Sequence, residues 1–199
     1  MKTSAAFALG LTALIFGGCV VSSVFPFYTE KDVVFEPALL GSWTKAEGGS
    51  EEEVWKFDKA GDRSYRFTLI QSQNATVMEG HTFKLEELLF LDVFSMDQDV
   101  RVIPPHYLFR VTQTTPTLKL VALDNERMRA FLAKDPGALA HHLVKNSDNP
   151  EDVRVVLTAS TADLQRFIRK HLKGSEVWAD EIEFKHQVEH RLETASKTD

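Results

Sequence analysis

The chain has 199 residues, 43% of them hydrophobic and 26% charged, which are proportions of a compact globular protein and exclude fibrous and wholly disordered classes. Its 29 acidic residues outnumber 23 basic ones, giving a formal net charge of −6. This balance offers no broad cationic surface to a phosphate backbone, so nucleic acid is not an expected partner. The single cysteine excludes an internal disulfide, a CxxC redox pair and cysteine-rich zinc sites.

An uncharged segment occupies most of the first thirty residues. Lys2 precedes it, and the next charged residue is Glu30. Its most apolar part, residues 5–16, is shorter than the roughly 20 residues that span a bilayer and fits the hydrophobic region of an export signal. The uncharged run continues through Phe27, which leaves an uncleaved signal anchor as an alternative.

The residues Phe16-Gly17-Gly18-Cys19 end this segment and resemble the lipobox of bacterial lipoproteins. The resemblance implies that residues 1–18 are a signal peptide and that Cys19 carries the lipid, palmitate included. Several acyl chains at one residue would hold the protein durably in a membrane. Val20 stands where an aspartate would favour the inner membrane, so the resemblance implies the periplasmic face of the outer membrane in a Gram-negative host.

The rest of the chain divides into three parts by composition. Residues 19–32 show no clear period and are predicted to be a lipidated tether, residues 33–186 a single α+β domain, and residues 187–199 a polar, disordered tail. Alternation of apolar and polar residues dominates the domain and predicts short antiparallel strands. The strands expected from it include residues 55–58, 64–69, 76–85, 88–94, 107–113, 118–123, 153–157 and 182–184.

Turn signals and capping residues complete the fold prediction. Gly and Asp within residues 59–63 predict a hairpin turn, and residues 95–105 a long loop. Asn125 is expected to cap one helix, and Asp135-Pro136 to begin a second that carries Leu139 and Leu143. Ser160 to Asp163 form a capping box before a third, whose apolar stripe is Leu164, Phe167, Ile168 and Leu172. We therefore expect an antiparallel β-barrel-like sheet with two or three helices in the C-terminal half.

Two family resemblances bear on this domain. Gly41-Ser42-Trp43 resembles the G-x-W entry signature of lipocalin-like barrels, which implies that Trp43 packs under the barrel floor, where a late basic residue such as Arg154 could cover it. A longer series resembles a group of uncharacterised bacterial lipoproteins and implies a cell-envelope location without an activity; it comprises residues 40–43, 65–67, 90–92 and 157–161 with the stripe from Leu164 to Ile168.

The sequence offers no catalytic motif. HExxH and GxSxG are both absent, and lipidation would consume the sulfur of Cys19. His186 and His190 have a spacing that could place two imidazoles on one metal, but no third ligand is evident. We therefore predict no catalytic residue, cofactor or metal, and keep a hydrolase or transferase with an unrecognised site as an alternative.

Aromatic residues are the best candidates for binding. On the predicted strands they alternate inward, where they either fill the barrel or line a pocket for a small apolar ligand. The candidates are Trp43, Trp55, Tyr65, Phe67, Phe90, Tyr107 and Phe109. The function expected is that of a membrane-anchored envelope lipoprotein that is a non-catalytic binding or assembly module, with an envelope protein as partner; the alternative is a lipocalin-like carrier.

Overall fold

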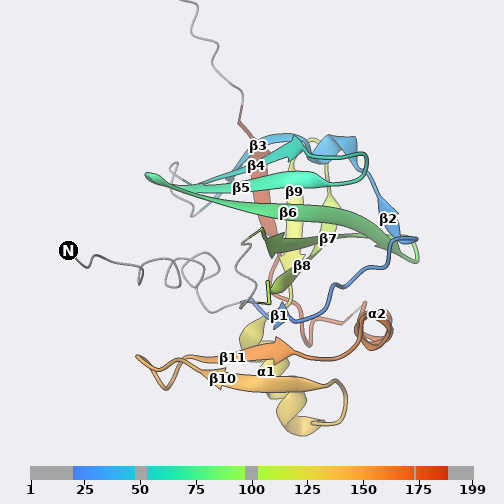
Figure 1. The fold of residues 1–199 in the computed structure, drawn as a ribbon, viewed down its shortest axis with the longest axis vertical. Coiled ribbons are helices and arrows are strands. Elements are labelled where there is room, and N and C mark those ends of the chain that lie inside the picture. The colour runs from blue at the N-terminus through green and yellow to red at the C-terminus, as the bar shows by residue number, and fades with distance from the viewer. Residues whose placement is uncertain (1–19, 48–52, 97–102, 173, 188–199) are drawn as a thin grey trace, which may run out of the picture.

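A closed antiparallel barrel of eight strands forms the larger part of the protein (Figure 1). The computed structural model describes residues 20–47, 53–96, 103–172 and 174–187. Neighbouring strands in sequence pair from β3 to β9, and β12 closes the barrel by pairing with both β9 and β3. The barrel strands are β3 (Gly41–Lys45), β4 (Glu53–Lys59), β5 (Tyr65–Gln71), β6 (Asn74–Leu85), β7 (Leu88–Ser95), β8 (His106–Gln113), β9 (Leu118–Ala122) and β12 (Ile182–His186).

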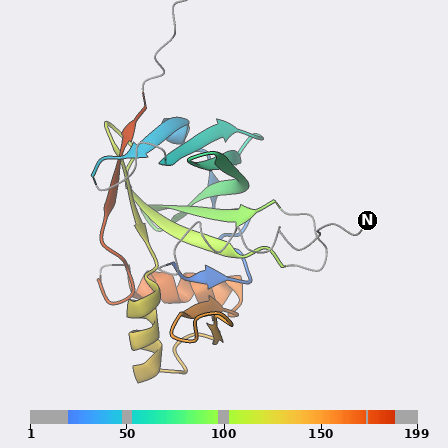
Figure 2. The ribbon, with the colours of Figure 1, turned by 90° about the vertical axis from the view of Figure 1, so that its left-hand side faces the viewer.

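A second, smaller layer lies against one side of the barrel (Figures 1 and 2). Strand β1 (Ser22–Ser23) joins the layer to the barrel because it pairs antiparallel with β8 and parallel with β11 (Val153–Leu157). Strand β10 (His141–Lys145) pairs with β11 and is the outermost strand of the sheet. The layer also contains helices α1 (Asn125–Lys134) and α2 (Thr161–Lys170).

Two short elements lie at the start of the barrel. Strand β2 (Val33–Val34) pairs with β6, and the 3-10 helix η2 (Pro37–Leu39) leads directly into β3. The predicted turn at residues 59–63 joins β4 to β5, whose strands pair from Glu53 with Gln71 to Lys59 with Tyr65. The barrel predicted from the alternating pattern is therefore confirmed.

The sequence predicts two or three helices in the C-terminal half. Of the three segments named as candidates, two form α-helices among the described residues, α1 and α2. Helix α2 begins as the capping box predicts, with the backbone N–H of Asp163 donating to Ser160 Oγ at 3.3 Å. In α1 the cap is Asp124, whose carboxylate accepts from the backbone N–H of Arg127 at 2.7 Å. Asn125, expected as the cap, is instead buried: its amide accepts from the N–H of Val155 and donates to the carbonyl of Val153, both at 2.8 Å.

The helix expected after Asp135-Pro136 is the strand β10. His141 and His142, adjacent in sequence, therefore point to opposite faces of a strand. Pairing with β11 along the whole length of β10 outweighs the weak helical pattern of this segment. Leu143, expected on a packed helix face, is 54% exposed.

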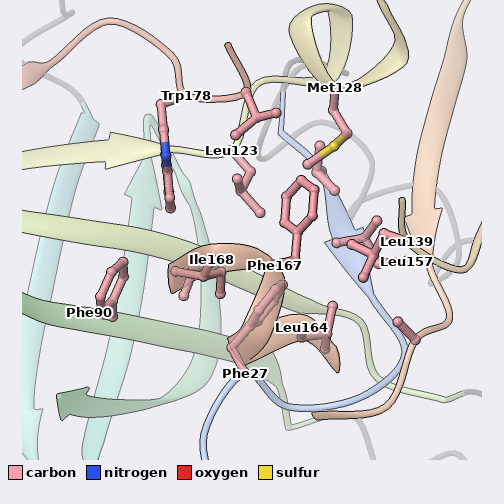
Figure 3. Packing of buried hydrophobic residues seen from close by; sticks show 14 of the residues in the cluster. Phe27, Phe90, Leu123, Met128, Leu139, Leu157, Leu164, Phe167, Ile168 and Trp178 are labelled. Atoms are coloured by element: carbon pink, nitrogen blue, oxygen red, sulfur yellow. The ribbon is translucent and has the colours of Figure 1, made fainter. Parts of the chain in front are cut away.

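Buried side chains form two clusters that share the wall of the barrel. The inner cluster lies inside the barrel and consists of Leu39, Trp43, Trp55, Phe57, Tyr65, Phe67, Leu69, Met78, Leu91, Val93, Phe109, Val111, Leu118, Leu120, Ala122 and Phe184. The outer cluster fills the space between the barrel and the second layer (Figure 3) and consists of Val21, Phe27, Phe83, Leu85, Phe90, Leu108, Val121, Leu123, Met128, Leu132, Leu139, Val155, Leu157, Ala159, Leu164, Phe167, Ile168, Leu172, Val177 and Trp178.

Strand β7 contributes to both clusters. Leu91 and Val93 face inward, and Phe90 faces outward toward α2 (Figure 3). The run Leu88–Leu91 is apolar at every position; its second half is fully buried, whereas Leu88 is 36% exposed. The second layer therefore covers only part of the strand.

The described part of the predicted tether, residues 20–32, is packed into the fold. Val21 and Phe27 are fully buried in the outer cluster, and the N–H of Val21 donates to the carbonyl of Leu123 at 3.1 Å. The side chains of Val21 and Phe27 insert between the barrel and the second layer, although the apolar residues of this segment follow no regular period. Cys19 and the predicted signal peptide lie outside the described residues. Neither described helix is long and apolar enough to cross a membrane.

Candidate functional site

The predicted ligand-binding aromatics lie mainly in the inner cluster. Trp43, Trp55, Tyr65, Phe67 and Phe109 are all buried there. The Trp55 ring contacts Phe67, Phe109 and Phe184, with ring centroids 5.1, 5.6 and 4.8 Å apart. These rings pack on one another, as aromatic rings in protein cores do.

Two of the seven candidates lie elsewhere. Phe90 faces out of the barrel, because the alternation on β7 directs Leu91 and Val93 inward; it stacks on Phe83 across the strand pair at 5.5 Å. Tyr107 is half-buried at the edge of the inner cluster. The structure therefore brings five of the seven side chains together.

Trp43 is buried in the inner cluster on β3, the first strand of the barrel. Its indole N–H donates to the carbonyl of Leu39 at 2.9 Å, and its ring makes an edge contact of 4.8 Å with His186 on the closing strand β12. Gly41 has a φ of +119°, and a Cβ at this position would clash with the His186 ring, so the glycine is required by the close approach. Arg154, the expected cover of Trp43, lies on β11 and binds Asp152 at 2.9 Å; the expectation is wrong because the closing strand supplies the cover.

A buried carboxylate lies on the outer wall of the barrel. Asp92 is 0% exposed on β7, where Oδ2 accepts from the backbone N–H of Phe27 at 2.9 Å and Oδ1 lies 2.8 Å from His106 Nδ1 on β8. An imidazole held by a carboxylate is the arrangement that orients a general base. Within the described residues the His106 ring has Asp92 as its only hydrogen-bond partner, and no serine, threonine or cysteine side chain is hydrogen-bonded to it.

A second imidazole borders this pair. His81 Nε2 lies 3.0 Å from Glu79 Oε1, and the ring makes a tilted contact with the Tyr28 ring, with centroids 4.8 Å apart. Burial, reinforced by the charges of Asp92, Glu30 and Glu79, raises the pKa of Tyr28 above its ordinary value, so its hydroxyl remains protonated. In the part of the chain that the structure describes, no three His, Cys, Asp or Glu side chains are arranged to hold a metal. His186, the described member of the predicted histidine pair, packs on Trp43.

Two exposed apolar side chains lie next to each other on the outermost strand, β10. Leu143 and Val144 are 54% and 49% exposed and point to opposite faces of the strand. On the Leu143 side, an open hollow of about 590 Å³ separates β10 from α1; it is lined by Glu126, Arg129, Ala130, Leu132, Ala133, Pro136, His141 and Leu143. Since one edge of β10 pairs with β11, its other edge presents backbone groups that have no strand neighbour among the described residues.

The chain matches no protein-family model, no curated protein and no solved structure in the comparisons made. The functional interpretation therefore rests on the residues themselves. Sequence reasoning missed the β10 edge because His141–Lys145 has the composition of either a helix end or a short strand. It missed the Asp92–His106 pair because the two residues are 14 positions apart and only the register of β7 and β8 brings them together.

Proposed function

We propose that this protein is a lipid-anchored module of the cell envelope that acts by binding a partner protein without catalysis. The observation that carries the proposal is the open edge of β10 with its two exposed apolar side chains. An extended segment of another protein can add to such an edge as a further strand, with backbone hydrogen bonds giving affinity and the side chains giving specificity.

The charge of the edge favours an acidic segment as the occupant. Strand β10 carries His141, His142 and Lys145 and no acidic residue, and Lys145 has no ion-pair partner among the described residues. A second copy of β10 is disfavoured: antiparallel pairing centred on Leu143 would place Lys145 of one copy opposite His141 of the other. Lysine on an edge strand is a common device against such self-association. The partner segment is therefore expected to alternate acidic with apolar residues.

A peptide of alternating glutamate and valine tests this proposal against its lysine-valine counterpart. With the full-length protein in lipid nanodiscs, the acidic peptide is expected to slow amide hydrogen exchange in residues 141–145, and the basic peptide to leave it unchanged. The pair of variants Leu143→Asp and Val144→Asp is expected to abolish the effect. Val77→Asp is the matched control, since Val77 is similarly exposed at 44% on β6, a barrel strand that does not pair with β10 or β11. Equal protection by both peptides, or none by either, would contradict the proposal.

The anchor has its own test. Cys19→Ser is expected to abolish palmitate labelling and to release the protein from the membrane fraction, because the lipid and its attachment site would both be lost. A membrane fraction that keeps the protein after this change would favour the uncleaved signal anchor instead.

We also propose that the barrel is lipocalin-like. The support is the meander from β3 to β9 closed by β12, the 3-10 helix η2 before β3, and the edge contact of Trp43 with His186. A carrier role inside this barrel would require a ligand to displace Trp55, Phe67 and Phe109, which are packed on one another. For this reason the exterior is the preferred binding surface.

A further inference from the structure

A guanidinium lies without a carboxylate partner at one end of the barrel. Arg110 projects from the outer face of β8, with its guanidinium carbon 5.1 Å from the centre of the Trp178 ring. Nη1 donates to the carbonyl of Leu172 at 2.6 Å, and Nε is buried with no hydrogen-bond partner. Among the described residues, no acidic side chain lies within ion-pair distance of it.

The surroundings of Arg110 make this charge costly. Burial lowers the pKa of the guanidinium from its ordinary value, and Glu181 opposes the shift only partly. Glu181 itself is engaged by the Thr112 hydroxyl at 2.6 Å and by Lys119 at 3.2 Å. A half-buried cation with unused donors is stabilised when an anion reaches it, and a guanidinium can bind a planar carboxylate through two parallel hydrogen bonds.

An open hollow of about 600 Å³ gives access to Arg110, within the range of about 300–1,000 Å³ typical of small-molecule sites. Apolar side chains from three elements line it: Leu88 and Leu89 at the start of β7, Val111 on β8, and Leu172 after α2. Thr112 adds a hydroxyl, and Glu86 and Glu87 lie in the β6–β7 turn that also borders the hollow. An apolar wall beside one cation suits a molecule with an alkyl chain and an anionic head.

We propose that this hollow binds a single-chain amphiphile with a carboxylate head, such as a fatty acid, with the head on Arg110 and the chain along Leu88, Leu89, Val111 and Leu172. A carboxylate fits better than a phosphate, because a phosphate dianion would bring two negative charges to one guanidinium that already has Glu181 nearby, in a hollow bordered by Glu86 and Glu87. Of the residues that line the hollow, Val111 belongs to the inner cluster and none lies on β10, so the site is independent of the partner-binding edge.

Photo-crosslinking tests the site in the full-length protein in nanodiscs. The probes are decanoate, decyl phosphate and decanol, each with a diazirine at the end of the chain. Decanoate is expected to label residues 86–89, 110–112 and 172, and unlabelled decanoate to compete; decanol and decyl phosphate are expected to label them at least about tenfold less. Labelling of inner-cluster residues that do not line the hollow, such as Trp55 and Phe67, equal labelling by decanol, or stronger labelling by decyl phosphate would overturn the proposal.

Two variants keep the test independent of folding. Arg110→Lys retains the positive charge but loses the forked geometry, and is expected to reduce labelling by decanoate about tenfold. Because Arg110 also packs on Trp178, the second variant is Leu88→Asp, at a position already 36% exposed, which places a negative charge in the alkyl wall. It is expected to give the same loss, and Val77→Asp is expected to give none. Undiminished labelling in Leu88→Asp would overturn the proposal.

Discussion

Replacing Asp92 by alanine tests how the N-terminal segment is held on the barrel. The change removes the shared partner of two groups: the N–H of fully buried Phe27 loses its acceptor at 2.9 Å, and His106 Nδ1 loses its partner at 2.8 Å. Leaving a buried polar group unsatisfied costs about 1–3 kcal/mol, so the two together are expected to lower the free energy of unfolding by about 2–6 kcal/mol. Urea unfolding followed by tryptophan fluorescence measures this difference.

Asp92→Asn is the matched control. Its amide oxygen can still accept from Phe27 N–H, and its amide nitrogen can donate to His106 Nδ1 when the imidazole proton is on Nε2. The asparagine variant is therefore expected to lose less than half as much stability as the alanine variant. Equal losses in the two variants, or a loss below about 1 kcal/mol in Asp92→Ala, would refute the reasoning, since the hydrogen bonds would then contribute little.

Three further changes probe the barrel and the N-terminal segment. Gly41→Ala is expected to destabilise the protein by about 1–3 kcal/mol in urea unfolding, because of the positive φ and the clash with His186, whereas Gly137→Ala, whose Cβ meets nothing closer than 3.8 Å, is expected to have little effect. Tyr65→Phe removes a hydroxyl that accepts from the N–H of Glu36 at 2.6 Å and donates to the Glu36 carbonyl at 3.0 Å. We expect the free energy of unfolding to fall by about 1–3 kcal/mol, and by less if Thr82 Oγ1, which lies 3.1 Å from the Tyr65 hydroxyl, takes over one of the Glu36 groups. Burial alone would raise the pKa of Asp32, but hydrogen bonds from Thr29 and Gln165 bring it below its ordinary value. Asp32 therefore stabilises the fold at pH values above its ordinary pKa, and this stability is lost as the pH falls through the lower pKa of the folded state. Asp32→Asn should flatten this part of the curve of stability against pH.

The barrel could be predicted from sequence because its signals are local. Alternation in Tyr65–Leu69 and the Gly-Asp turn before it determine a hairpin without reference to the rest of the chain. The same holds for α2, where Ser160 caps a stripe of regularly spaced apolar residues. Each pattern lies within about fifteen residues, so no long-range contact is needed to interpret it.

The features missed are those that depend on pairing between distant segments. Phe90 was expected inside the barrel. Its direction depends on which alternate residues of β7 face the second layer, and that layer is built from residues more than thirty positions away in the sequence. His141–Lys145 forms a strand because β11 lies beside it, and residues 20–32 are packed because Phe27 inserts among residues such as Leu164 and Phe167 (Figure 3). In both cases tertiary contacts outweigh a weak local preference.

The packing of residues 20–32 bears on how the proposed anchor would work. Val20 bridges Asp124, and Val21 is hydrogen-bonded to Leu123, so the fold begins one peptide bond after Cys19. Consecutive Cα atoms are about 3.8 Å apart, which leaves no tether between a lipid on Cys19 and the folded domain. The parallel pairing of Ser22 with Val156 directs Val20 toward the Val153 end of β11, which is also the Lys145 end of β10. A lipid on Cys19 would therefore hold this end of the open edge close to the bilayer, where a partner segment attached to the same membrane would meet it.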